Sequence, residues 1–189
     1  MCQIISIEGN IGVGKTTFIE LCKDAIIDKT NKPVIFLKEP VELWQTIKDK
    51  DDKDILTYFY EDNKTWAFSF QMMAYISRLS LLKKTISDHP DAIIIIERSV
   101  FTDKNVFAKM LYDDNLINEI DYQIYNTWFD HFLDMTKLNG IIYLKCDPET
   151  AHQRVIERSR SGETIPLEYL QKCSQYHDNW ILSSNINTI

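Results

Sequence analysis

Four short apolar segments, rich in β-branched residues, recur along the chain at residues 3–8, 34–38, 92–97 and 141–146. Their hydrophobicity is nearly continuous instead of alternating, which is typical of parallel strands that are buried on both faces. Long stretches with helical spacing of apolar residues separate these segments. The pattern predicts an α/β fold, in which a central parallel sheet of four to five strands carries helices on both faces.

The helical stretch 117–138 carries an apolar stripe. Its members are Ile120, Ile124, Trp128, Phe132 and Met135. Residues at this spacing lie along one side of a helix. The stripe therefore predicts packing against the core or against another helix.

A glycine-rich segment connects the first apolar run to the next helical stretch. Its residues are Gly9, Asn10, Ile11, Gly12, Val13, Gly14, Lys15, Thr16 and Thr17. The first eight match the phosphate-binding loop Gly-x-x-x-x-Gly-Lys-Thr, whose glycines let backbone N–H groups turn toward a polyphosphate. In such a loop the lysine supplies positive charge to the outer phosphates, and the threonine hydroxyl binds Mg²⁺. The segment predicts a nucleotide site.

Carboxylates stand at the ends of three predicted strands. Glu39 follows the second strand, and Glu97 ends the third, just before Arg98. Asp147 follows the fourth strand and is expected to cap the next helix. Ligands of open α/β sheets bind beyond the carboxyl ends of the strands, so this convergence favours a site that contains Glu39 and Glu97. The alternative is that such a carboxylate only faces a helix N-terminus.

Polar residues also interrupt two of the helical stretches. Gln71 and Arg78 lie seven residues apart in the aromatic-rich stretch 58–84 and share a side with Ala74. This arrangement suits hydrogen bonding to a planar ligand, although a solvent-facing stripe has the same spacing. In the stretch 99–112, Asp103 and Phe107 share a face four residues apart.

Three arginines gather near the end of a helix in an otherwise acidic chain. Arg154 and Arg158 lie one turn apart, and Arg160 follows beside a Ser-Gly break. They are either solvated helix surface or a clamp on a transferring phosphoryl group. The clamp is favoured because Lys15 and Arg98 otherwise supply the only positive charge near the predicted site.

The composition restricts the class of protein. A chain of 189 residues fits a single domain, and its net charge of −7 argues against a nucleic-acid partner. The longest aliphatic run, residues 92–96, is too short to span a bilayer. The four cysteines show no metal spacing, and the first strand begins too early to leave room for a signal peptide, so we expect a cytoplasmic protein with reduced thiols.

At this point the chain resembles the deoxynucleoside kinase family, which includes deoxycytidine and deoxyguanosine kinase. The similar stretches cover residues 9–17, 39–44, 66–71, 97–103, 154–160 and 165–170. The resemblance runs from residue 3 to about residue 180. It implies a P-loop kinase fold in one domain spanning 1–189, and ATP-dependent phosphorylation of a deoxynucleoside 5′-hydroxyl, with Mg²⁺ as cofactor.

The resemblance also implies a role for each matching residue. Glu39 would be the general base, Arg98 would hold Glu39 and the phosphoryl group, and Glu97 would join Thr16 at the Mg²⁺ site. Tyr60 and Glu163 would bind the sugar 3′-hydroxyl. Gln71 would bind the base, Phe107 would stack on it, and Trp44 and Phe70 would line its pocket. Arg154, Arg158 and Arg160 would form a lid, at about residues 154–165, over the ATP phosphates.

Base preference and assembly follow from the same resemblance. Members that prefer cytosine or purine deoxynucleosides carry an arginine and an aspartate at the positions of Arg78 and Asp103, and Ala74 resembles the deoxycytidine kinase type. We therefore expect deoxycytidine or a purine deoxynucleoside to be favoured over thymidine. The resemblance further implies a homodimer formed through residues 100–110 and 117–138, although the apolar stripe is equally compatible with packing inside one chain.

The chain departs from the family pattern in two places, and three alternative functions stay open. The segment between residues 160 and 166 is one residue shorter than in cellular relatives, and the family continues beyond residue 189 into a fifth strand, an adenine-contacting loop and a last helix. Residues 185–189 are expected to begin that strand. The rivals are a nucleoside monophosphate kinase, an inactive nucleotide-binding structural homologue and a broad-specificity or thymidine kinase. A regulatory GTPase is disfavoured because the sequence has no Asn-Lys-x-Asp motif.

Overall fold

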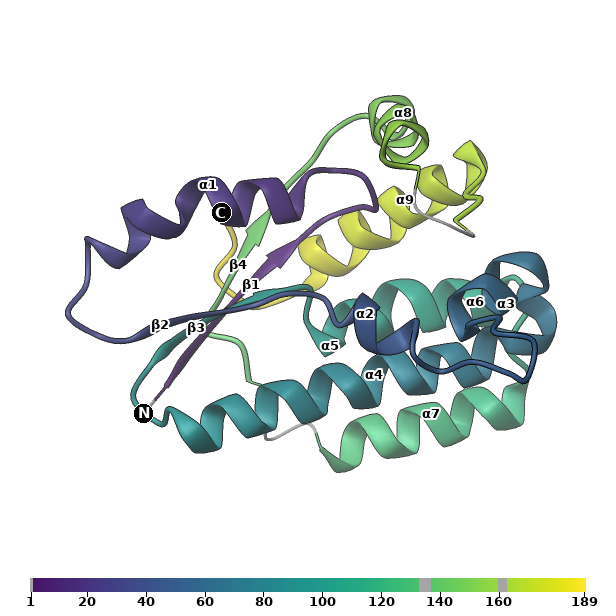
Figure 1. Ribbon diagram of the computed structural model, residues 1–189, viewed down its shortest axis with the longest axis horizontal. Helices are drawn as coiled ribbons and strands as arrows, with labels where there is room; N and C mark the ends of the chain where they lie inside the picture. The colour runs from purple at the N-terminus through teal and green to yellow at the C-terminus, as the bar shows by residue number, and fades with distance from the viewer. Residues whose placement is uncertain (1, 133–136, 160–162) are drawn as a thin grey trace.

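The computed structural model describes residues 2–132, 137–159 and 163–189 (Figure 1). Within these ranges the chain forms a four-stranded parallel sheet with the order β2-β3-β1-β4. The strands are β1 (Gln3–Glu8), β2 (Val34–Leu37), β3 (Ile93–Glu97) and β4 (Gly140–Tyr143). Because the strands are parallel, their carboxyl ends meet at one edge of the sheet, where the candidate residues were expected.

The two faces of the sheet are covered by different helices. Ile94 and Ile96 point from β3 into a core shared with α4, η1 and α9, whereas Ile95 points to the opposite face and packs near Ile19 of α1. Figure 1 shows α1 and α4 on opposite sides of the strands. The alternation explains why β3 is apolar from Ile93 to Ile96, since both of its faces are buried. The predicted α/β fold with helices on both faces is confirmed.

Helices fill the connections between the strands, and further helices follow β4. They are α1 (Lys15–Ile27), α2 (Val41–Trp44), α3 (Ile55–Glu61), α4 (Asn63–Asp88), α5 (Val100–Thr102), the π-helical η1 (Asp103–Ala108), α6 (Lys109–Asp113), α7 (Glu119–His131), α8 (Pro148–Arg158) and α9 (Leu167–Ser183). Across the described part of the chain, no helix is both long and apolar enough to cross a membrane.

One helix boundary differs from the expected one because a side chain caps a new helix. The stretch 58–84 was expected to be one helical region, but Asp62 caps a new helix by accepting a hydrogen bond from the Thr65 N–H at 3.2 Å. This N-cap separates α3 from α4. Asp147 does occupy the N-cap position of α8, but its side chain makes no capping hydrogen bond.

The apolar stripe of α7 does not face the core. Tyr125 and Phe129 are the buried residues of this helix, whereas Ile120, Ile124 and Trp128 are 65%, 40% and 47% exposed. Phe132 packs beside the Tyr125–Phe129 cluster, and Met135 lies outside the described residues. The expectation of core packing is therefore wrong for the first three members of the stripe. Packing of this stripe against another helix remains as the alternative interpretation.

The last residues extend the sheet. Residues 187–189 run parallel to β4, with Ile141 N–H donating to Asn187 O at 2.8 Å and Ile189 N–H donating to Ile141 O at 3.0 Å. They occupy the place beside β4 that a fifth strand would take. All four cysteines lie within the described ranges and none forms a disulfide there.

Candidate active site

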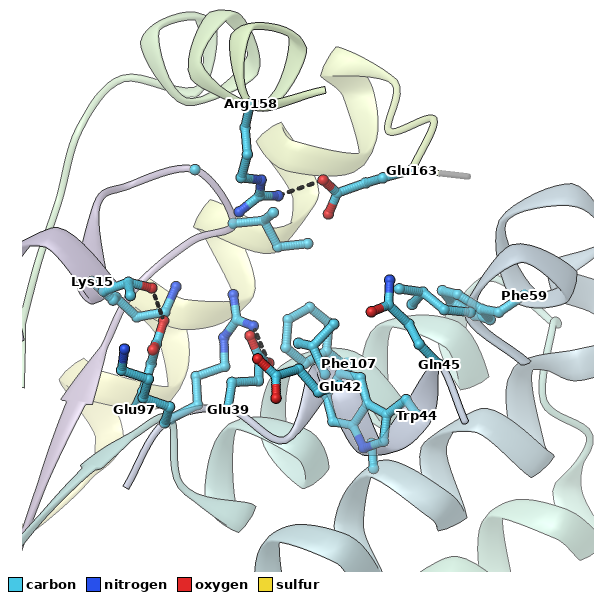
Figure 2. A pocket seen from close by; sticks show the side chains of 18 of the residues that line it. Lys15, Glu39, Glu42, Trp44, Gln45, Phe59, Glu97, Phe107, Arg158 and Glu163 are labelled. Atoms are coloured by element: carbon cyan, nitrogen blue, oxygen red, sulfur yellow. Dashed lines mark hydrogen bonds and ion pairs between the residues drawn. The ribbon is translucent and has the colours of Figure 1, made fainter. Parts of the chain in front are cut away.

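A cavity of about 830 Å³ opens at the carboxyl edge of the sheet. Its wall includes the end of the phosphate-binding loop, the segment after β2, the middle of α4 and the tip of α8 (Figure 2). The predicted site residues on this wall are Ile11, Gly12, Gly14, Lys15, Thr16, Thr17, Glu39, Trp44, Tyr60, Phe70, Gln71, Ala74, Arg78, Glu97, Arg98, Asp103, Phe107, Arg154, Arg158 and Glu163. The fold thus brings together residues that lie between Ile11 and Glu163 in the sequence.

The phosphate-binding loop is fixed by close packing of its glycines. Gly12 has a φ of +79°, and a Cβ at this position would lie 2.3 Å from the backbone oxygen of Ala151. At Gly9, whose φ is +143°, a Cβ would lie 2.4 Å from the backbone oxygen of Leu144. Neither position accepts a larger residue without moving backbone. Both contacts tie the loop to the β4–α8 segment.

Lys15 lies against its own loop. Its Nζ donates to Gly9 O at 3.1 Å and to Asn10 O at 2.8 Å, and its side chain is buried. Burial, assisted by the positive charge of Arg98, lowers the pKa of Lys15 to about 7. A bound polyphosphate would restore the positive charge, because a nearby anion favours the protonated amine.

Gly9, Asn10 and Val13 do not reach the cavity wall. Asn10 instead supports the loop from behind: its Nδ2 donates to Leu170 O at 2.8 Å, and its Oδ1 accepts from Ile11 N–H at 2.8 Å. Val13 is buried, and its carbonyl accepts a hydrogen bond from Arg154 Nη1 at 3.0 Å. These three residues hold the shape of the loop, and the other loop residues line the cavity.

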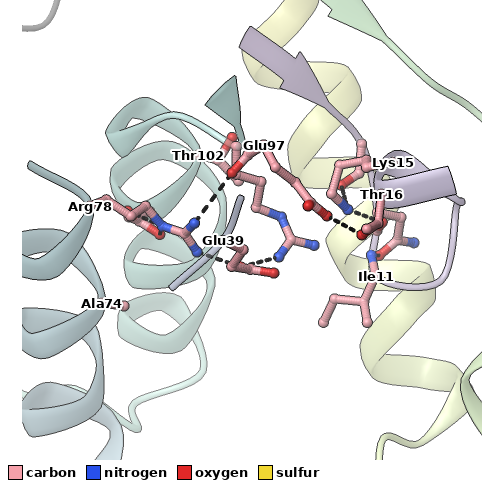
Figure 3. Close-up of polar contacts among 12 residues, drawn as sticks. Ile11, Lys15, Thr16, Glu39, Ala74, Arg78, Glu97 and Thr102 are labelled. Atoms are coloured by element: carbon pink, nitrogen blue, oxygen red, sulfur yellow. Dashed lines mark hydrogen bonds and ion pairs between the residues drawn. The ribbon is translucent and has the colours of Figure 1, made fainter. Parts of the chain in front are cut away.

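Glu39 is the carboxylate at the centre of the site. Its Oε1 accepts from Arg98 Nη1 at 2.7 Å and from Arg78 Nη2 at 2.5 Å (Figure 3). Burial opposes ionisation of Glu39, but the positive charges of Arg98 and Arg78 outweigh it and hold the pKa of Glu39 well below its usual range. Glu39 is therefore ionised at neutral pH, and both arginines share one of its oxygens.

Arg78 links Glu39 to a second buried carboxylate. Its Nε lies 3.0 Å from Asp103 Oδ2, and both side chains are almost completely buried. Burial raises the pKa of Asp103 to about 6, although the Arg78 guanidinium opposes this shift. The Arg78 guanidinium also lies over the Trp44 ring, 5.1 Å from its centroid. Arg78 and Asp103, which the resemblance linked to base preference, thus form an ion pair on the cavity wall.

Aromatic side chains form one end of the cavity. Phe59 stacks on Phe70 with ring centroids 4.6 Å apart, and Trp44 meets Phe70 edge to face at 5.4 Å. Beside them, Gln71 is 2% exposed, and its Oε1 has no hydrogen-bond partner among the described residues. A buried amide oxygen without a partner costs free energy, so this slot suits a planar ligand that donates a hydrogen bond.

Thr16 and Glu97 meet at the other end of the cavity. The Thr16 hydroxyl donates to Glu97 Oε1 at 2.7 Å (Figure 3). A hydroxyl and a carboxylate are the hard oxygen donors that Mg²⁺ accepts when phosphates and water complete its shell. The described residues contain no group of three or more His, Cys, Asp or Glu side chains that could hold a metal ion.

The arginines of α8 overhang the cavity. Arg158 forms an ion pair with Glu163, with Nη2 and Oε2 2.5 Å apart (Figure 2). Arg154 lines the cavity as well as bonding to Val13. Arg160 lies outside the described residues. Tyr60 and Glu163 both line the cavity, as the predicted sugar-binding pair requires.

Several wall residues were not anticipated. Lys38, Glu42, Gln45, Phe59, Glu157 and Tyr169 also line the cavity. Glu42 lies on α2 and Gln45 directly follows this helix, so both come from the segment after the second strand end, where the sequence placed Glu39. Tyr169 comes from α9 and lies in the stretch 165–170 that resembles the family, but neither its spacing nor its residue type signals its approach to the site.

Comparison with known proteins identifies the family. The model of the deoxynucleoside kinase family matches residues 5–189. The chain belongs to this family. Its sheet and phosphate-binding loop are those of the P-loop kinase fold of deoxynucleoside kinases, as the resemblance predicted.

Individual relatives are similar over most of the chain. Human (Homo sapiens) deoxycytidine kinase is 35% identical over 97% of this chain and 77% of its own length. The mitochondrial deoxyguanosine kinase of Xenopus laevis is 32% identical, covering 94% of this chain and 72% of the relative. A probable deoxycytidine kinase of Fowlpox virus is 34% identical, covering 96% and 72%.

Proposed function

We propose that this deoxynucleoside kinase transfers the γ-phosphoryl group of ATP to the 5′-hydroxyl of a deoxynucleoside. The observation that carries the proposal is the position of Glu39. This ionised carboxylate lies between the phosphate-binding loop and the aromatic slot, and its Oε1 is fixed by two arginines. A nucleoside monophosphate kinase would instead need cations for the phosphate of its acceptor, and a carboxylate here would repel that phosphate.

The proposed reaction needs positioning and charge, with little covalent chemistry. Glu39 accepts the proton of the 5′-hydroxyl as the oxygen attacks phosphorus. Arg98 holds Glu39 and stabilises negative charge on the transferring group, and Lys15 binds the outer phosphates. Thr16 and Glu97 hold Mg²⁺, which neutralises phosphate charge when bound. Arg154, Arg158 and Arg160 supply further positive charge from the lid.

The proposed acceptor site lies at the aromatic end. Gln71 pairs with the edge of the base, and its unpartnered Oε1 supports this role. Phe107 stacks on the base, and Trp44, Phe70 and Ala74 form the slot around it. Tyr60 and Glu163 bind the sugar 3′-hydroxyl.

We further propose that the base is cytosine or a purine, not thymine. The Arg78–Asp103 pair lines the same cavity as Ala74 and would narrow the space that a thymine methyl needs. The names of the relatives, deoxycytidine and deoxyguanosine kinases, agree with this preference.

The α7 face supports assembly as a homodimer. Ile120, Ile124 and Trp128 form an exposed apolar patch on the outer side of α7. In contrast, Val100, Val106 and Met110 are buried within the chain, so α7 and not residues 100–110 would supply the surface.

A cytoplasmic location with reduced thiols stays a prediction.

A substrate panel tests the proposed reaction. Purified protein with ATP and Mg²⁺ should phosphorylate deoxycytidine, deoxyadenosine or deoxyguanosine faster than thymidine. Glu39→Gln should lower kcat by about 10²- to 10⁴-fold, the usual contribution of a general base. Glu149→Gln, on the exposed surface of α8, is the matched control and should keep the wild-type rate. Absence of turnover with all four deoxynucleosides would favour the inactive homologue, and an unchanged rate in Glu39→Gln would refute the proposed base.

A further inference from the structure

Glu8, the last residue of β1, is a completely buried carboxylate that does not line the cavity. Its Oε1 accepts hydrogen bonds from Ser99 N–H at 2.9 Å and from Ser99 Oγ at 2.6 Å. Its Oε2 accepts from the Thr102 hydroxyl, and Ser6 Oγ donates to Oε1 at 2.5 Å. A buried carboxylate is expensive unless it is hydrogen-bonded, and three of these four donor groups come from the segment that follows Arg98.

The backbone of Arg98 adopts an unfavourable conformation. Its φ is +63°, in the left-handed region that non-glycine residues rarely occupy. Such conformations persist only when the surrounding structure holds them, and they cluster at functional sites. On the N-terminal side, Arg98 N–H donates to Ile7 O at 3.1 Å. On the C-terminal side, the chain is held by the bonds from Ser99 and Thr102 to Glu8. The residues that fix this turn therefore come from the end of β1, namely Ile7 and Glu8.

The turn determines where the Arg98 side chain points. From it the guanidinium reaches Glu39, with Nη1 2.7 Å from Oε1, and passes over the Phe107 ring with its central carbon 5.0 Å from the centroid. Its Nε is buried and has no hydrogen-bond partner among the described residues. The side chain is therefore bound to Glu39 through Nη1, at the end of the guanidinium. A side chain held in this way follows any rotation of its own backbone.

We propose that Glu8 is a positioning residue for phosphoryl transfer: it holds the left-handed turn that aims Arg98 at Glu39. This inference rests on the proposed function, because it assigns the effect of Glu8 to the catalytic arginine. Glu8 lies outside the cavity wall, and it acts through Ser99 and Thr102 on Arg98. The bonds to Glu8 stabilise one orientation of the guanidinium before any substrate binds, which is the preorganisation that charge stabilisation requires.

Steady-state kinetics of Glu8→Gln and a matched control test the proposal. Glu8→Gln keeps the shape of the side chain but loses the charge and the acceptor for Thr102. It should lower kcat between about 10- and 100-fold, the cost of misplacing a catalytic group by about 1 Å, with the KM values for ATP and deoxynucleoside within threefold of wild type. Ser6→Ala removes a donor to the same Oε1 without touching the turn, and should keep kcat within threefold. Thr102→Val provides a second variant that removes only the hydroxyl, with a smaller loss of kcat in the same direction.

A double-mutant cycle separates positioning from general stability. In an Arg98→Lys background, Glu8→Gln should change kcat by less than twofold, because the guanidinium through which Glu8 acts is gone. The same fold loss in both backgrounds, or an unchanged kcat in Glu8→Gln, would overturn the inference. A wild-type rate in Arg98→Lys would instead overturn the role of Arg98 in the proposed function.

A crystal structure of Glu8→Gln gives an answer that does not depend on activity. The proposal expects the φ of Arg98 to leave the left-handed region and the bond from its Nη1 to Glu39 to be lost or lengthened. An unchanged Arg98 conformation would contradict the proposal, whatever the substrate of the enzyme.

Discussion

Arg78 Nη2 lies 2.5 Å from Glu39 Oε1, so the arginine that pairs with Asp103 also touches the proposed general base. Asp103, Arg78, Glu39 and Arg98 form a buried chain of alternating charge with no net charge. Removing one member would leave a buried charge without its partner, which is costly. Tests of base preference must therefore remove Arg78 and Asp103 together.

Arg78→Met combined with Asp103→Ala should increase the use of thymidine. The pair of substitutions removes both charges and opens space beside Ala74 for the thymine methyl, while Glu39 keeps its bond to Arg98. We expect the ratio of kcat/KM for thymidine to that for deoxycytidine to rise by about 10- to 200-fold, as for a contact of methyl size in a pocket. A competition assay with both nucleosides measures this ratio directly.

The control for this experiment is the exposed ion pair of Lys109 and Asp113, 2.6 Å apart on α6. Lys109→Met with Asp113→Ala removes the same types of charge outside the cavity wall and should leave the ratio unchanged. If thymidine were already the best substrate of the wild-type protein, the proposed role of the Arg78–Asp103 pair would be wrong.

Thr16→Val should weaken the response to Mg²⁺. The substitution removes one of the two oxygen donors of the proposed metal site and leaves Glu97 without its hydrogen-bond donor. We expect the Mg²⁺ concentration for half-maximal activity to rise by about 10- to 100-fold, with partial recovery of the rate at high Mg²⁺. A titration of activity against Mg²⁺ measures this shift, with Thr30→Val in the exposed loop before β2 as the control. An unchanged titration curve would remove Thr16 from the metal site.

Gly12→Ala should damage the phosphate-binding loop. Its Cβ would lie 2.3 Å from Ala151 O, and the φ of +79° adds strain. We expect a loss of about 1–3 kcal/mol in the free energy of unfolding, together with a higher KM for ATP, because the loop must move away from α8. At Gly140 an added Cβ would lie 3.6 Å from Asn187 O, an ordinary contact. Gly140→Ala is thus the matched control, and equal losses in the two variants would contradict the packing argument.

The sequence predicted the parts of the site that depend on strand ends. Glu39 and Glu97 were found because parallel strands necessarily bring their carboxyl ends to one edge, whatever the details of packing. The phosphate-binding loop was found because its backbone geometry demands glycine at fixed spacing. These features follow from local chemistry and one topological rule.

Other features depend on packing between distant segments and had no local signal. In the sequence, Glu8 was only the last residue of a predicted strand, because its partners Ser99 and Thr102 lie more than 90 residues away. On α7, periodicity correctly placed Ile120, Ile124 and Trp128 on one side, but a second apolar side carries Tyr125 and Phe129. The side that faces the core is decided by the partner surface of α4, where Tyr75 packs against both aromatic rings.

The exposed side of α7 leads to a prediction about assembly. Trp128→Glu places a charge in the centre of the proposed dimer surface, where desolvation of a carboxylate is unfavourable. We expect the wild-type protein to sediment as a dimer and the variant as a monomer at the same concentration. Gln175→Glu, on the exposed side of α9, adds the same charge elsewhere and should stay dimeric. A monomeric wild-type protein would refute the homodimer.

His177 leads to a prediction about the pH dependence of stability. This histidine of α9 is completely buried beside Tyr143 and Phe107, with Nδ1 2.7 Å from Cys173 O. Its Nε2 has no hydrogen-bond partner among the described residues, so a proton there would be buried without an acceptor. Burial lowers the pKa of His177 to about 3. In the unfolded chain the pKa returns to about 6.5.

Between pH 6.5 and 3 the unfolded chain therefore binds a proton at this position that the folded chain does not. The free energy of unfolding falls as the pH falls through this window, by about 1.4 kcal/mol per pH unit once His177 is protonated in the unfolded state. From pH 7 to pH 5 the contribution is about 2 kcal/mol. Asp103, whose pKa is raised to about 6, gives a contribution of opposite sign in part of this window. That contribution is unchanged when variants at other positions are compared.

His177→Gln should consequently lose about 2 kcal/mol less between pH 7 and pH 5 than the wild-type protein does. Urea unfolding at the two pH values measures this difference, and the comparison cancels whatever the substitution costs at pH 7. His89, which follows α4, is exposed, so His89→Gln should show the wild-type loss. Equal losses in all three proteins would mean that His177 gains its proton in the folded state as readily as in the unfolded chain. Such a result would show that His177 is not held in its neutral form in the folded protein.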